Sequence, residues 1–164
     1  MNNIDWIKEL VITEQQMEDT GTINLSAVSL DAHLDEQTLE FMQDIKAGFV
    51  EAAATFNQFK GSAVGTLKIY GISNTKADFM LFRNGYKLIF SIKRAGEIEV
   101  YSSIMSTHFL TGAQEQEAKP TERDSIRAHW GAYGELQWHN KNLPVKLDYL
   151  IRYYLSRFVR ESTK

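Results

Sequence analysis

Two turn signals in the middle of the chain fix the pairing of three strands. Asn84-Gly85 separates two segments in which apolar and polar residues alternate, and this dipeptide favours the type I′ hairpin turn, whose central residues need positive φ angles. Counting outward from it predicts that Arg83 pairs with Tyr86, Phe82 with Lys87, Leu81 with Leu88, Met80 with Ile89 and Phe79 with Phe90. A three-residue loop at Arg94-Ala95-Gly96, with Gly96 left-handed, then predicts that Lys93 pairs with Glu97, Ile92 with Ile98, Phe90 with Val100 and Ile89 with Tyr101.

This register keeps apolar side chains on one face, called here the inner face, through both turns. The inner face consists of Phe79, Leu81, Leu88, Phe90, Ile92, Ile98 and Val100. A slip of one residue would move all of them to the other face, so the alternation and the turns support the same pairing. Together with the apolar segment 67–72, the ribbon predicts an antiparallel meander over residues 64–104.

The opposite, outer face of the ribbon also carries large apolar side chains. Met80, Phe82, Ile89 and Tyr101 lie at its centre, with Lys87 and other charged residues toward the edges. A sheet face in full contact with water normally holds fewer large apolar residues, so we expect this face to be covered. The C-terminal helix of the same chain is one candidate for the cover, and a partner or ligand is the other.

Helical periodicity precedes and follows the meander. Apolar spacing predicts a short helix within residues 4–17 and a longer one that begins at the cap Asp35 and ends at Gly61. Residues 18–35 and 105–120 resemble loops, residues 121–133 fit a helix and a strand equally, and residues 134–139 favour a strand. Pro144 suits the first turn of a last helix.

The last helix has two different faces. Its predicted buried stripe is Leu147, Leu150, Ile151, Tyr154, Leu155 and Phe158. The other face combines basic and tyrosine residues, namely Lys146, Tyr149, Tyr153, Arg157 and Arg160. The order of elements predicts a single α+β domain, residues 1–164, in which an antiparallel sheet of four to six strands packs with N-terminal helices and a long C-terminal helix.

Composition limits the kinds of site that the chain can form and the cellular compartment that it fits. It has no cysteine, which excludes disulfides, thiolate nucleophiles and Cys-based zinc sites and suits the cytoplasm, where thiols stay reduced. The sequence shows neither a signal-peptide pattern nor an apolar run of transmembrane length, so we expect no membrane insertion. Charge is distributed unevenly: residues 1–59 hold 11 acidic and 2 basic residues, while the rest of the chain is mildly basic. Such an asymmetry is compatible with self-complementary assembly, with a nucleic-acid surface, or with oppositely charged elements that face each other within one fold.

The sequence contains no motif that identifies a catalytic, metal or cofactor site. His33, His108, His129 and His139 lack the helical spacing of a compact metal site. The glycines of GSAVGT lack the lysine of a Walker loop, and no GxSxG elbow occurs. We therefore assign no catalytic, metal-binding or cofactor-binding residue, and the balance is against an enzyme.

These observations favour a non-catalytic binding or regulatory module that contacts another protein or a second copy of itself. The predicted contact surface is the outer sheet face, with Met80, Phe82, Lys87, Ile89 and Tyr101, or the basic and tyrosine face of the last helix. Two alternatives stay open. One is a small hydrophobic ligand or lipid in a cavity between a curved sheet and the C-terminal helix, and the other is a nucleic acid bound by the last helix.

Overall fold

The computed structural model describes residues 4–21, 30–104 and 121–163, which belong to two compact units, residues 1–33 and 34–164. Each unit is described by itself. The first contains helix α1 (Asp5–Thr20), which confirms the helix predicted near the start of the chain. Gly21 ends α1 in the left-handed conformation (φ 67°), and its N–H donates to the carbonyl of Met17 over 2.8 Å.

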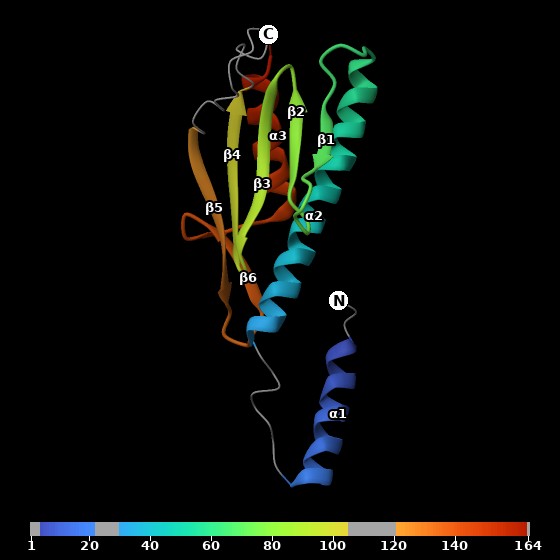
Figure 1. Cartoon of the computed structure of the whole chain (residues 1–164), viewed down its shortest axis with the longest axis vertical. Coiled ribbons are helices and arrows are strands. Elements are labelled where there is room, and N and C mark those ends of the chain that lie inside the picture. The colour runs from blue at the N-terminus through green and yellow to red at the C-terminus, as the bar shows by residue number, and fades with distance from the viewer. Residues whose placement is uncertain (1–3, 22–29, 105–120, 164) are drawn as a thin grey trace. The chain divides into compact units, whose positions relative to one another are not determined.

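The second unit is an α+β fold, as predicted, built from one antiparallel sheet and two helices (Figure 1). Helix α2 (Leu30–Lys60) contributes its residues from Leu34 onward to this unit, and helix α3 (Leu147–Glu161) follows the sheet. The strands are β1 (Lys68–Gly71), β2 (Phe79–Arg83), β3 (Tyr86–Arg94), β4 (Glu97–Ile104), β5 (Thr121–Trp130), β6 (Leu136–Asn140) and β7 (Leu143–Pro144). Each strand pairs with the next in sequence, so the described residues form a seven-stranded sheet, whereas four to six strands were expected.

The predicted pairing of β2 with β3 is confirmed at all five positions, from Phe79 opposite Phe90 to Arg83 opposite Tyr86. Gly96 is left-handed (φ 81°) as expected, but the second turn is shorter than predicted because Arg94, rather than Lys93, lies opposite Glu97. An irregularity between Ile92 and Arg94 absorbs the difference. The predicted pairs beyond it are therefore unchanged.

The core lies between the inner face of the sheet and both helices. Met42, Ile45 and Phe49 of α2 are fully buried against the inner strand residues, and Leu150, Tyr154 and Phe158 of α3 join the same cluster. The rings of Phe79 and Phe90 stack 5.0 Å apart at its centre. In Figure 1, α3 lies behind the strands, and the outer face of the sheet is turned toward the viewer. The C-terminal helix is therefore not the cover that we considered for the outer face.

Three local predictions are settled by the structure. Asp35 is not the N-cap of α2, because the helix already begins at Leu30 and the intervening segment contains the helix formers Ala32 and Leu34. Pro144 does not begin the last helix; it lies in the short edge strand β7, where the missing N–H costs no inner ladder bond. Residues 121–130 form a strand rather than a helix, and the predicted loop at 105–120 lies outside the described residues.

None of the helices in the described residues combines the length and the hydrophobicity that crossing a bilayer requires.

Candidate binding face on the sheet

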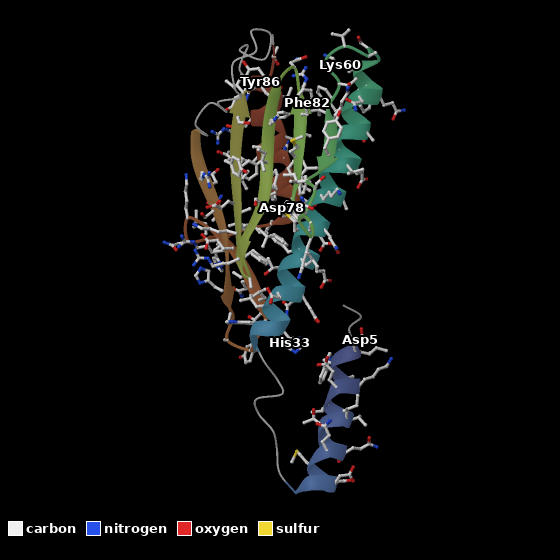
Figure 2. All side chains as sticks on the ribbon, viewed as in Figure 1. Asp5, His33, Lys60, Asp78, Phe82 and Tyr86 are labelled. Carbon is white, nitrogen blue, oxygen red and sulfur yellow. The ribbon has the colours of Figure 1, made fainter. Side chains whose placement is uncertain are left out.

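Strands β2, β3 and β4 supply the apolar centre of the outer face. Met80 of β2 lies opposite Ile89 of β3, which in turn lies opposite Tyr101 of β4. Phe82, labelled in Figure 2, lies two residues after Met80 on β2, and its ring meets the ring of Tyr70 edge-on at 6.3 Å. Ile89 is 8% exposed and Tyr70 is 45% exposed, so the patch is enclosed at its centre and open toward β1.

Lys87 also lies on the outer face, opposite Phe82, and is partly buried. The structure thus brings together the five predicted outer-face residues, Met80, Phe82, Lys87, Ile89 and Tyr101, on three adjacent strands. Their common location follows from the register, because side chains two residues apart on a strand share one face.

Two carboxylates of β4 lie beside this patch and are held by cations from both neighbouring strands. Glu97 and Glu99 have side chains only 10% and 12% exposed. The ion-pair distances are 3.1 Å from Arg94 to Glu97, 3.6 Å from Arg127 to Glu97, 3.3 Å from Lys93 to Glu99 and 3.1 Å from Arg123 to Glu99. The guanidinium of Arg123 also lies over the ring of Tyr101 at 4.8 Å. Four cations around two carboxylates leave a net positive charge on this part of the face.

A basic pocket of about 340 Å³ opens beside these cations, between β5, β6 and the turn that follows β6. Its basic and polar lining includes Arg123, Arg127, His129, His139, Lys141 and Asn142. Lys141 and Asn142 have φ angles of 52° and 66°, as a type I′ turn requires, and this tight turn brings their side chains to the pocket rim.

The two histidines of the basic pocket are in contact. Their rings lie edge to face with centroids 4.8 Å apart, and His139 lies opposite Arg127 in the pairing of β5 with β6. The Nδ1 atom of His139 is buried and has no hydrogen-bond partner in the described part of the chain. Buried polar atoms are nearly always paired, so this nitrogen is an exception among the described residues.

Sequence reasoning did not identify the basic pocket. Ile126, Ala128 and Trp130 alternate along the sequence, which in a strand would place Arg127 and His129 together on the other face. The same residues also fit a helix, so the sequence alone does not bring these two side chains together. The residues that β6 adds to the pocket are placed by the β5–β6 register. The sequence between these strands has no turn signal as strong as Asn84-Gly85, so this register could not be predicted.

The basic and tyrosine face of the last helix is a separate surface. Tyr149 and Tyr153 are 65% and 55% exposed, and Lys146 and Arg160 are exposed as well. Because the opposite stripe of α3 packs on the inner face of the sheet, this helix face and the outer sheet face lie on different sides of the unit. Arg157 already bonds Glu161 at 2.9 Å, and this hydrogen bond raises the pKa of its guanidinium.

Between the sheet and α3, the described residues line a small cavity of about 20 Å³. At its wall the hydroxyl of Tyr154 donates to Asp124 Oδ2 over 2.9 Å. Burial, assisted by the negative charge of Asp124, raises the pKa of Tyr154 well above its usual value. This volume is about that of one water molecule, so the cavity gives no support to a lipid site here.

The described residues include no group of three or more His, Asp or Glu side chains that could hold a metal ion. His108 lies outside the described residues. Comparisons with protein-family models, curated proteins and solved structures find no match to this chain.

Proposed function

We propose that this protein is a non-catalytic binding module that associates with a second copy of itself through the outer face of the sheet. The observation that carries the proposal is the apolar centre of that face, formed by Met80, Phe82, Ile89 and Tyr101 on the side of the sheet opposite α2 and α3. Large apolar side chains gathered on a sheet face that its own core helices do not cover are typical of a contact surface.

The patch has an apolar centre and a charged rim. Lys87 lies on one side of Ile89, and Glu97 and Glu99 lie with their four cations toward the other end of β4 on the same face. An apolar centre inside a polar rim is the usual arrangement of a protein–protein interface, and a twofold contact would bring the same apolar centre of both copies together.

Sedimentation equilibrium of the wild type and of Phe82→Asp tests the proposal. We expect the wild type to associate as concentration rises. A charge in the centre of the contact should weaken the association constant by about 30-fold or more, the effect of losing an interfacial anchor. Tyr133→Asp is the matched control, because Tyr133 is also aromatic but is 96% exposed in the turn between β5 and β6.

Two results would contradict the proposal. A wild type that stays monomeric at every concentration would exclude self-association. Loss of thermal stability in Phe82→Asp with no change in association would show instead that Phe82 packs within its own chain. Circular dichroism of both variants before sedimentation separates these effects from unfolding.

A further inference from the structure

We propose that the basic pocket between β5 and β6 binds the phosphate group of a small phosphorylated molecule. The proposal does not require self-association, because the pocket is built from β5, β6 and their following turn and the apolar patch from β2, β3 and β4. The two are neighbours on the outer face, since Arg123 lines the pocket and also lies over the ring of Tyr101. It rests on the shape of the pocket and on the chemistry of its lining.

The lining is rich in hydrogen-bond donors that carry positive charge. Arg123, Arg127 and Lys141 line the pocket together with one acid, Asp124, whose carboxylate accepts the Tyr154 hydroxyl. The described carboxylate contacts use Nη1 of Arg123 and Nη2 of Arg127. Because a guanidinium has five N–H donors in a planar fork, each arginine can bind Glu97 or Glu99 and still donate to a ligand.

A phosphate monoester fits this set of groups better than a carboxylate does. It carries up to two negative charges and three terminal oxygens, which match several cationic donors arranged around one space. Asn142 adds a neutral donor and His129 a ring N–H or acceptor at the rim. The volume of about 340 Å³ lies within the range of small-molecule sites, so it has room for the group to which the phosphate is attached.

Histidine ring signals in nuclear magnetic resonance provide the test. The full chain is titrated at fixed pH and ionic strength with inorganic phosphate, with ribose 5-phosphate and with a short oligothymidine, whose phosphates are diesters. We expect saturable shifts of the His129 and His139 ring signals with no shift of His33, and tighter binding of ribose 5-phosphate than of the other two probes. Phe82→Asp should bind ribose 5-phosphate as the wild type does.

Charge-removing variants then locate the site. Arg127→Gln and Lys141→Gln should each weaken ribose 5-phosphate binding by about tenfold, the effect of losing one charged hydrogen bond. Lys141 is an exposed turn residue, so its variant keeps the test valid if Arg127→Gln is unstable without its contact to Glu97. Arg152→Gln removes the same charge from an exposed position on α3 and should change binding by less than twofold.

Several results would overturn the proposal. Shifts that grow linearly without saturation, or equal weakening by Arg152→Gln, would show only general attraction of anions. Equal affinity for inorganic phosphate and ribose 5-phosphate would exclude a site built for a phosphorylated molecule. Tighter binding of the oligothymidine would assign the surface to nucleic acid instead.

Discussion

Arg83 at the end of β2 is the clearest place to test how the second unit holds together. Its side chain is on the inner side of the sheet and the residue is only 5% exposed. The guanidinium donates to the carbonyl of Gly65 over 2.8 Å and to the carbonyl of Val159 over 3.0 Å. It also lies within 3.2 Å of Ser162 Oγ and over the ring of Phe56 at 5.5 Å. One side chain thus joins β2, the segment before β1 and the end of α3.

Replacing Arg83 with methionine keeps most of the apolar stem and removes the donors. Two short hydrogen bonds from a charged group contribute about 3 to 6 kcal/mol to stability. Relief of the cost of burying a cation offsets part of this loss. We expect a net decrease of about 3 kcal/mol in the free energy of unfolding, which for a chain of this size lowers the melting temperature by about 6 to 12 °C.

Urea unfolding followed by far-ultraviolet circular dichroism measures this loss. Arg83→Lys should lose about half as much, because a lysine keeps the charge but cannot bond the two carbonyls as a planar fork does. Arg152→Met, at an exposed position on α3, is the control for removing an arginine and should be nearly neutral. A loss below about 0.5 kcal/mol in Arg83→Met would refute the reasoning, since it would mean that the buried donors contribute almost nothing beyond their desolvation cost.

Two further predictions concern a turn and a tyrosine. Gly96→Ala should lower the free energy of unfolding by about 1 to 3 kcal/mol in urea, because the φ of Gly96 is 81° and a Cβ there would meet the Leu34 side chain at 3.3 Å. Gly85→Ala is the control, since Gly85 has a similar φ of 83° but no neighbour within 4 Å, and it should lose less stability. Equal losses in the two variants would exclude a role for the Leu34 contact. Since the folded state raises the pKa of Tyr154 above its ordinary value of 10.0, stability should fall as pH rises above about 10. Tyr154→Phe should make this fall shallower between pH 9 and 11, and an unchanged slope would contradict the assignment.

Much of the fold followed from local patterns. The Asn84-Gly85 turn and the alternation on either side of it predicted the β2–β3 register residue by residue, and the inner-face residues became the core. Likewise, the apolar stripe of the last helix includes the buried Leu150, Tyr154 and Phe158. Two errors lay at element boundaries, at Asp35 and Pro144, where a cap residue or a proline is compatible with more than one structure. The pair at the second turn and the number of strands were also wrong.

The candidate site was only partly accessible to the same reasoning. The outer patch was predicted because its residues lie on neighbouring strands joined by recognisable turns. The basic pocket was not, because its members come from β5 and β6 and their meeting depends on which pattern residues 121–133 adopt. The last helix was expected as a possible cover of the outer face, but helical periodicity shows which stripe is buried and not which surface buries it.

By itself the sequence determined the strand pairing around Asn84-Gly85, the β3–β4 pairs from Ile92 and Ile98 onward, and the inner and outer faces of these strands. Side-chain alternation and turn geometry are properties of a few consecutive residues, so they can be read locally. Only the tertiary structure decided which side of the sheet both helices cover, where the basic pocket forms, and that Arg83 is buried. These features join distant segments, as in the bond from Gly96 N–H to Thr38 Oγ1, 58 residues apart, and in the contact of Arg83 with Ser162, 79 residues apart. Such contacts depend on how whole elements pack against each other, which local periodicity does not specify.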